Sequence, residues 1–298
     1  MTNDRTVLAL GFFDGIHIGH GALLKKASQR AEELSAKPAV LTFDSHPDTL
    51  VRMEKVPLIN SSADKVYIIR EYFGIETVFF LHFNAETMNM SWRDFLDYII
   101  KKYNCCHLVA GVDFTFGAGG QGNAGLLLQY CEDNSLGCDI IPAVLYGGRP
   151  VSSTRIRLLL EEGKIEEANN LLGHPHLLTG VVRTGHRLGR TMQAPTVNMA
   201  FADGVLVPKE GVYIAKALFR GQKRQAVLNI GTRPTFDGGK ITVETHILDF
   251  GGDLYGERIC VELYSYIRHE HKFDSSHELT LRIKEDIQMA RRFFENKK

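Results

Sequence analysis

In the first half of the chain, short apolar runs alternate with segments in which apolar residues recur every three or four positions. The runs predict buried strands at residues 7–10, 39–43, 77–81, 107–110 and 140–145. The periodic segments predict helices at residues 22–34 and 66–73, and Ser91 with Asp94 forms a capping box for a third helix that ends at Tyr103. Such alternation is typical of a parallel sheet with helices on its faces.

From Gly173 onward the pattern changes, because strand-like runs follow one another without helices between them. They cover residues 178–183, 196–201, 212–219, 225–230, 241–248 and 258–266. About six short strands predict a small closed antiparallel barrel. Ser275 then caps a final helix with an apolar stripe of Leu279, Ile283, Ile287 and Ala290. We therefore predict an α/β domain over residues 1–173 and a six-stranded β-barrel with a C-terminal helix over residues 174–298.

Composition narrows the classes of function. The chain has 35 basic and 35 acidic residues, which argues against a broad polyanion-binding surface and a nucleic-acid partner. The five cysteines include no C-x-x-C pair, so we expect reduced thiols and neither a disulfide framework nor a zinc site. No apolar run approaches the ~18 residues of a membrane span. We expect a cytoplasmic protein that is a monomer or a transient oligomer.

The decapeptide of residues 11–20 carries the first candidate chemistry, because it follows the first strand and opens the first helix. Glycines at Gly11, Gly15 and Gly19 let the backbone approach a polyphosphate, and a helix N-terminus offers free amides to phosphate. His17 and His20 are three residues apart, so both rings can face one side of the first turn. The alternative is that the two histidines only cap the helix.

Hydroxyl groups followed by arginines form a second motif, in which Ser153, Thr154 and Arg157 stand at a predicted helix start. This pattern favours another phosphate cradle. The alternative is that the hydroxyl groups simply cap the helix.

The barrel half carries a third group of polar residues. Gly180, Gly185 and Gly189 are spaced along a loop that can wrap a phosphate, or that is merely a flexible hairpin. Thr196 and Asn198 share one face of a strand, with hard oxygen ligands suited to Mg²⁺, or they are two solvent-facing polar residues. Glu244 stands in a β-rich run. If it faces inward, its burial needs a chemical reason, and deprotonating a primary alcohol is such a reason. The alternative is a solvated surface glutamate.

Together these motifs resemble the bifunctional riboflavin kinase/FAD synthetase family over nearly the whole chain. The first half is similar to its nucleotidyltransferases in G-x-F-D-G-x-H-x-G-H, in S-S-T-x-I-R, and at residues 42–47 and 111–117. The second half is similar to riboflavin kinase in P-T-x-N, the Glu244 segment, and residues 231–236, 253–256 and 267–273. The resemblance implies a Rossmann-like nucleotidyltransferase domain followed by a kinase barrel.

The resemblance also implies roles for individual residues. His17 and His20 would contact the phosphates of ATP in a loop with Gly11, Phe13, Asp14, Gly15 and Gly19. Ser153, Thr154 and Arg157 would clamp the polyphosphate, and His46 and Asp113 would line the pocket where adenine and flavin meet. In the barrel, ATP would be bound by Gly180, Gly185, Gly189 and Thr196. Mg²⁺ would be bound by Thr196 and Asn198, and the general base would be Glu244. Riboflavin would become FMN, and the FMN phosphate would attack the α-phosphorus of ATP to give FAD and pyrophosphate.

Several alternatives stay open at this point. Met192-Gln193-Ala194 stands where the family has Leu-Gly-Phe, which leaves an FMN adenylyltransferase with an impaired kinase barrel as the narrower alternative. Asp44 replaces a more usual glutamate, and residues 117–122 lack an expected arginine. The residues 17–20 are also similar to the HIGH element of aminoacyl-tRNA synthetases. A transferase for another phosphorylated substrate, such as phosphopantetheine, and a flavin-binding protein without catalysis are the remaining possibilities.

Overall fold

The computed structural model describes residues 4–43, 56–82, 84–183, 196–201, 204–233, 240–271 and 273–296. The chain folds into two compact units. The first comprises Met1–Leu58 and Lys65–Ser153, and the second comprises Ile59–Asp64 and Thr154–Lys298. The short segment 59–64 thus belongs to the second unit, although the chain before and after it belongs to the first.

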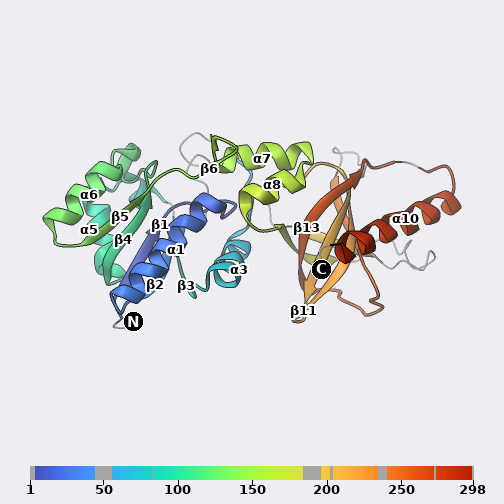
Figure 1. Ribbon diagram of the computed structural model, residues 1–298, viewed down its shortest axis with the longest axis horizontal. Coiled ribbons are helices and arrows are strands. Elements are labelled where there is room, and N and C mark those ends of the chain that lie inside the picture. The colour runs from blue at the N-terminus through green and yellow to red at the C-terminus, as the bar shows by residue number, and fades with distance from the viewer. Residues whose placement is uncertain are drawn as a thin grey trace. The chain divides into compact units, whose positions relative to one another are not determined.

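A parallel sheet of five strands forms the centre of the first unit, in the order β3-β2-β1-β4-β5 (Figure 1). The strands are β1 (Thr6–Leu10), β2 (Lys37–Phe43), β3 (Thr77–Leu81), β4 (Cys105–Gly111) and β5 (Gly137–Ile141). Leu10 at the end of the central strand pairs with Leu41 of β2 and Ala110 of β4. The carboxyl ends of these three strands therefore meet at one edge, where open parallel sheets bind their ligands.

Helices cover both faces of this sheet, as the alternating pattern predicted (Figure 1). They are α1 (Ile18–Glu33), α3 (Ser62–Phe73, in this unit from Lys65 onward), α4 (Ala85–Asn89), α5 (Trp92–Lys102) and α6 (Ala124–Asp133), with a 3-10 turn η1 at Ala118–Gly120. Leu8 and Leu10 of β1 belong to a core cluster with residues of α5 and α6. The alternate residues of β1 point to the opposite face, on which α1 packs.

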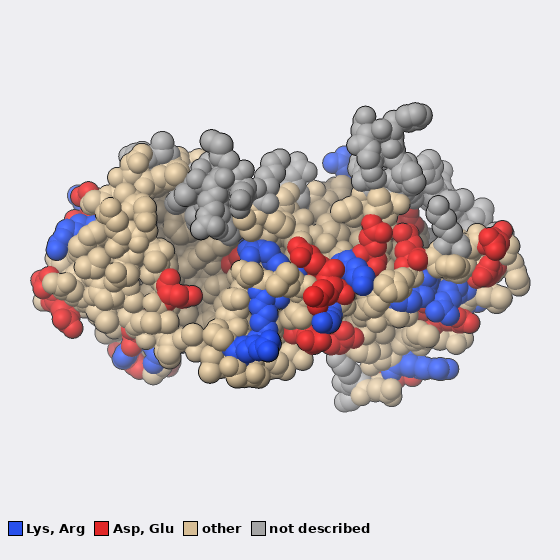
Figure 2. All heavy atoms as spheres, turned by 90° about the horizontal axis from the view of Figure 1, so that it is seen from above, with Lys and Arg blue, Asp and Glu red and all other residues tan. Residues whose placement is uncertain are grey.

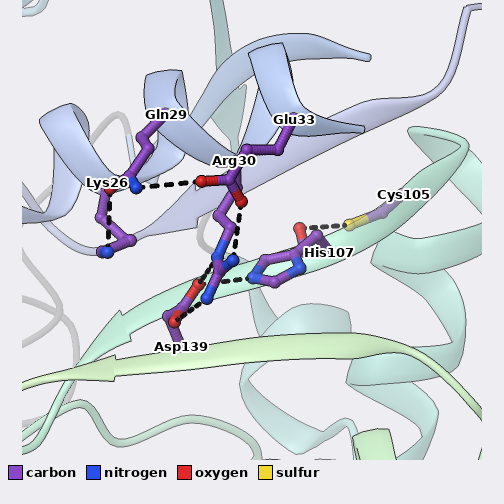
Figure 3. Close-up of polar contacts among 7 residues, drawn as sticks. All are labelled: Lys26, Gln29, Arg30, Glu33, Cys105, His107 and Asp139. Carbon is purple, nitrogen blue, oxygen red and sulfur yellow. Dashed lines mark hydrogen bonds and ion pairs between the residues drawn. The ribbon is translucent and has the colours of Figure 1, made fainter. Parts of the chain in front are cut away.

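A polar network connects α1 to two strands of the sheet (Figure 3). Arg30 of α1 binds Asp139 of β5 through two contacts, Nε to Oδ2 at 2.7 Å and Nη2 to Oδ1 at 3.1 Å. The Nε2 atom of His107 in β4 lies 2.8 Å from the same carboxylate. The hydrogen bonds from Arg30 are the main cause of a lowered pKa of the Asp139 carboxyl. This network fixes α1 against the sheet, and with it the loop that precedes α1.

The last strand of the sheet differs from the prediction of a run at residues 140–145. β5 begins earlier and ends at Ile141, while β6 (Leu145–Tyr146) pairs with β7 (Arg149–Pro150) in a separate two-stranded sheet. Pro142 explains the break, because proline has no amide hydrogen to donate to a ladder. The apolar side chains that follow Pro142 made the run look continuous in the sequence.

A closed barrel of six strands forms the second unit, in the order β10-β11-β12-β9-β8-β13 (Figure 1). The strands are β8 (His176–Arg183), β9 (Thr196–Phe201), β10 (Gly211–Phe219), β11 (Gln222–Arg233), β12 (Lys240–Ile247) and β13 (Arg258–Arg268). Every pair of neighbouring strands is antiparallel. The predicted six-stranded antiparallel barrel is confirmed.

Three helices accompany the barrel: α7 (Ser153–Glu162), α8 (Ile165–Leu172) and α10 (Ser276–Glu295). Asn169 fixes α8 to two strands, because its Nδ2 donates to the carbonyl of Leu263 at 2.9 Å and its Oδ1 accepts from the amide of His176 at 2.8 Å. Ala290 and Phe294 of α10 pack on a cluster formed by β10 and β11. The C-terminal helix therefore covers part of the outer face of the barrel.

Candidate active sites

The loop that joins β1 to α1 has an unusual backbone. Phe13, Gly15 and Ile16 have φ angles of 53°, 80° and 45°, and the side chains of Phe13 and Ile16 are completely buried. For residues other than glycine, such left-handed conformations cost roughly 1–2 kcal/mol each. Gly11 fits this loop because an added Cβ atom would lie 3.0 Å from the Phe13 ring. Backbone strain of this kind concentrates at functional sites.

Three side chains from other elements hold the backbone of this loop. Thr42 Oγ1 and Lys65 Nζ both donate to the carbonyl of Phe12, each at 2.8 Å. Ser153 Oγ donates to the carbonyl of Asp14, a buried residue, at 2.9 Å. Ser153 is thus brought to the loop. The other two members of its motif, residues 154 and 157, follow in α7 and are counted with the second unit.

His17 and His20 lie together at the start of α1, as their spacing predicted. Their rings stack with centroids 3.7 Å apart and planes inclined by 13°. His17 is also the N-cap residue, since its Nδ1 accepts a hydrogen bond from the His20 amide at 3.3 Å. Gly19 leaves room for this arrangement, because a Cβ there would lie 3.0 Å from the His17 ring. Helix capping therefore explains the contact of His17 with the backbone. It does not explain why the His20 ring stacks on His17.

The surroundings of His20 favour a neutral imidazole. Burial is the main cause of a pKa well below the ordinary value, and the charges of His17 and Lys65 lower it further. The Nδ1 atom is shielded from solvent and has no hydrogen-bond partner among the residues that the structure describes. A neutral ring beside the free amides of a helix N-terminus can donate the hydrogen of its N–H group to an oxygen of a bound phosphate.

Asp113 lies at the same edge of the sheet, two residues after the end of β4, and it is exposed. Gly111 leaves room for the Asp113 carboxylate, because an added Cβ would lie 2.8 Å from it. The parallel pairing of β1 with β4 places this turn beside the loop after β1. His46, predicted to line the same pocket, lies outside the described residues.

Lys65 also contacts this loop, although its sequence motif did not predict it. It lies in α3 with 1% of its surface exposed, and its ammonium group lies 4.0 Å from the centroid of the Phe12 ring. The available signal was its position, three and four residues before the fully buried Ile68 and Ile69. A lysine on the apolar stripe of a helix needs a partner inside the protein.

In the barrel, strand register brings the predicted kinase residues together. Asn198 of β9 is paired with Glu244 of β12, and Thr196 is paired with His246. On the other side of β12, Glu244 is paired with Asn229 of β11. Residues directly opposite one another in a sheet point to the same face. Thr196, Asn198 and Glu244 therefore share one face, as predicted for the first two.

This shared face is the outer face of the barrel. Val227 and Asn229 are two residues apart on β11, and Val227 packs in the cluster with α10 on the outside. Glu244, paired with Asn229, points the same way and is half-buried, whereas its neighbours Val243 and Thr245 are buried. The inward orientation considered for Glu244 is therefore not found, because the interior is filled by the alternate residues of β12.

Glu270 is a second carboxylate close to this group, and it was not predicted from the sequence. Asn229 Nδ2 donates to Glu270 Oε1 at 3.2 Å. A Cβ atom added to Gly231 would lie 2.2 Å from the same oxygen, so a larger residue there would displace the Glu270 carboxylate. Asn229 is therefore the cross-strand neighbour of Glu244 and the hydrogen-bond partner of Glu270.

The glycine-rich loop after β8 is only partly described. Gly180 lies in β8, where an added Cβ would approach the Ala200 carbonyl to 2.8 Å, so it allows β8 and β9 to lie close together. Gly185, Gly189 and residues 192–194 lie outside the described residues. Within the described residues, no group of three or more His, Cys, Asp or Glu side chains is arranged to hold a metal ion.

Two further properties of the chain bear on its chemistry. All five cysteines are free thiols, and burial is the main cause that raises the pKa of Cys105 and of Cys260 to about 12. On the face drawn in Figure 2, basic side chains lie beside acidic ones and do not form one broad basic area. No helix in the described part of the chain is long and apolar enough to cross a membrane.

Comparison with known proteins gives matches to both halves. A family model described as FAD synthetase matches residues 1–155, and one described as riboflavin kinase matches residues 172–294. The bifunctional riboflavin kinase/FMN adenylyltransferase of Bacillus subtilis is 37% identical over 297 residues, which cover 98% of this chain and 93% of the relative. The protein of the same description from Escherichia coli K12 is 36% identical over 293 residues, covering 97% and 92%.

The fold is also similar to a solved structure. A crystal structure described as a macrolide-efflux protein from Streptococcus pneumoniae matches with a TM-score of 0.86 and 32% identity, over 98% of this chain and 95% of that chain. The functional description belongs to that protein. The match supports a shared fold along nearly the whole chain.

Proposed function

Because the chain belongs to the bifunctional riboflavin kinase/FMN adenylyltransferase family and has both activities of FAD biosynthesis, we propose where each reaction takes place. FMN adenylylation is assigned to the loop after β1, within a domain of residues 1–173. Riboflavin phosphorylation is assigned to the outer face of the barrel at Glu244, within a domain of residues 174–298. The observation that carries the second assignment is the pairing of Asn198 with Glu244.

For adenylylation, His17 and His20 would bind the ATP phosphates at the N-terminus of α1. Two stacked imidazoles beside free backbone amides can stabilise charge that develops on phosphate oxygens. Ser153, Thr154 and Arg157 would hold the polyphosphate, and His46 and Asp113 would line the flavin and adenine pocket. A phosphate oxygen of FMN attacks the α-phosphorus of ATP, and pyrophosphate leaves with the electrons of the broken P–O bond.

For phosphorylation, Glu244 would take the proton of the 5′-hydroxyl of riboflavin as this oxygen attacks the γ-phosphorus of ATP and ADP leaves. Thr196 and Asn198 offer a hydroxyl and an amide oxygen on the same face, and these donors suit Mg²⁺ bound together with substrate phosphates. Mg²⁺ would neutralise phosphate charge there. Gly180, Gly185 and Gly189 would wrap the ATP phosphates.

We place the reaction in the cytoplasm, with a monomer or a transient oligomer as the active species. Support comes from the five free thiols, which are typical of a reducing compartment.

Chromatography of one reaction tests both assignments together. Purified protein is incubated with riboflavin, ATP and Mg²⁺, and we expect FMN first and FAD later. Omitting Mg²⁺ should stop FMN formation. If FAD formed only when FMN was supplied, the kinase assignment would be wrong and the barrel would be a silent module.

A further inference from the structure

Lys65 combines burial with a specific backbone partner. Its side chain comes from α3, is almost entirely buried, and donates to the Phe12 carbonyl at 2.8 Å. The ring of Phe12 lies beneath the ammonium group with its centroid 4.0 Å away, a cation–π contact. Because burying an ammonium group is costly unless it is well partnered, a charge kept at this place calls for a purpose beyond packing.

We propose that Lys65 is a positioning residue for FMN adenylylation, which holds the Phe12 carbonyl and thereby sets the strained loop that presents its amides to the ATP phosphates. This proposal rests on the assignment of adenylylation to the loop after β1. Lys65 would touch no substrate and would act through the backbone of Phe12 and Phe13.

Peptide geometry explains how one carbonyl can control the loop. The Phe12–Phe13 peptide is trans, as are all the described peptide bonds, and the N–H of a planar trans peptide points away from its C=O. A carbonyl held by Lys65 and Thr42 therefore directs the Phe13 amide to the opposite side. The φ angle of 53° at Phe13 begins immediately after this fixed peptide. Without the two donors, this peptide can relax toward a less strained conformation.

The charge of Lys65 contributes as well as its hydrogen bond. A fixed positive charge at the Phe12 carbonyl favours an anionic ligand bound to the same loop. The same charge helps to lower the pKa of His20, after burial and His17. Lys65 thus favours the neutral ring at the point where phosphate would bind.

Two substitutions separate these contributions. Lys65→Met removes both the donor and the charge, whereas Lys65→Gln keeps a donor without the charge. We expect kcat/KM for FAD formation to fall by about 10²-fold in Lys65→Met, which is the loss of rate that a small misplacement of the reacting groups causes. The fall should be smaller in Lys65→Gln. Riboflavin phosphorylation in the same molecules should be unchanged, which serves as the control for folding. Lys25→Met, at an exposed position of α1, should leave both activities unchanged.

Two further readouts distinguish positioning from a structural role. Removing the cation should raise the pKa of His20, so the acid limb of the pH profile for FAD formation should move to higher pH in both variants. Thr42→Val combined with Lys65→Met should cost less than the sum of the single effects, because both donors act on one carbonyl.

Three results would overturn the proposal: unchanged FAD formation in Lys65→Met, an equal fall of both activities, or an unmoved acid limb. Failure of the site assignment looks different. If the double variant His17→Ala, His20→Ala still formed FAD normally, the loop would not be the adenylylation site at all.

Discussion

Asn198 and Glu244 occupy directly opposite positions on the antiparallel strands β9 and β12. Side chains at opposite positions lie about 5 Å apart at their Cβ atoms, so an amide oxygen and a carboxylate can serve one substrate. Strand register alone thus brings together two residues separated by 46 positions in the chain.

Glu244→Gln tests this site with almost no change in side-chain shape. We expect FMN formation from riboflavin to fall by 10²–10⁴-fold, the usual contribution of a general base, because the amide cannot accept the hydroxyl proton. FAD formation from supplied FMN should continue at the normal rate. Product chromatography with each substrate measures both. Loss of both activities in a folded protein would contradict the two-site assignment.

The stacked histidines provide the complementary test. His17→Ala combined with His20→Ala removes both rings from the start of α1, the proposed phosphate-binding site, so FAD formation should fall by roughly 10²–10³-fold. FMN should then accumulate as the end product from riboflavin. His277→Ala, at an exposed position of α10, is the matched control and should form FAD normally. FAD accumulating at the usual rate in the double variant would remove these residues from the mechanism.

A bidentate ion pair fastens the C-terminal helix to the barrel. Arg268 Nε lies 3.1 Å from Asp286 Oδ1 and its Nη2 lies 2.7 Å from Oδ2, with side chains that are 16% and 3% exposed. Asp286→Asn leaves a mostly buried guanidinium without its counter-charge, so the free energy of unfolding should fall by roughly 2–4 kcal/mol. Faster hydrogen exchange of α10 amides should accompany this loss.

Glu285→Gln is the matched control on the same helix. It removes the Arg282–Glu285 pair, whose side chains are 38% and 55% exposed, and such surface pairs contribute only about 0–1 kcal/mol. Equal losses in Asp286→Asn and Glu285→Gln would mean that the buried pair is not what holds α10.

His176 makes the stability of the barrel depend on pH. Its side chain is fully buried, neither ring nitrogen has a hydrogen-bond partner among the described residues, and burial is the main cause that lowers its pKa from 6.5 to about 3. Below pH 6.5 the His176 imidazole therefore binds a proton in the unfolded chain, while in the folded barrel it stays neutral until the pH falls to about 3. The stabilising effect is complete above pH 6.5 and is lost as the pH falls toward 3, at up to ~1.4 kcal/mol per pH unit.

His176→Leu should remove this dependence, because leucine binds no proton in either state. Hydrogen exchange of β8 and β13 amides at pH 7, 6 and 5 reports on the barrel, whereas the single tryptophan, Trp92, lies in the first unit. We expect the acid-induced loss of protection to be smaller in His176→Leu and unchanged in the exposed-site control His277→Gln. The same slope in all three proteins would rule out His176 as the cause.

Local features of this fold were predictable from the sequence because few residues determine them. The capping boxes at Ser91 and Ser275 are both confirmed, each with a hydrogen bond of 3.1 Å from an amide three residues later. The stacking of His17 on His20 and the shared face of Thr196 and Asn198 likewise follow from spacing within a turn or a strand. Pro142 shows the limit, because an apolar run was extended across a residue that cannot join the ladder.

Residues whose partners are distant in the chain were not predictable in this way. Lys65 and Phe12 are 53 positions apart, and Glu270 and Asn229 are 41 positions apart. The sequence left open whether Glu244 faces the interior or the solvent for a related reason, since a period of two indicates which residues share a face but not which face is inside.

The segment Ile59–Asp64 has a consequence for how such enzymes can be recombined. Ile59 and Asn60 are fully buried, and Asp64 accepts a hydrogen bond from Thr179 of β8, so this stretch is packed with the barrel although it is encoded among the residues of the first unit. A chimera that joined the first 153 residues of one parent to the barrel of another would give that barrel a foreign segment. A functional exchange between homologues should therefore transfer the barrel together with these six residues. A single crossover cannot transfer both, because residues 65–153 of the first unit lie between them in the chain.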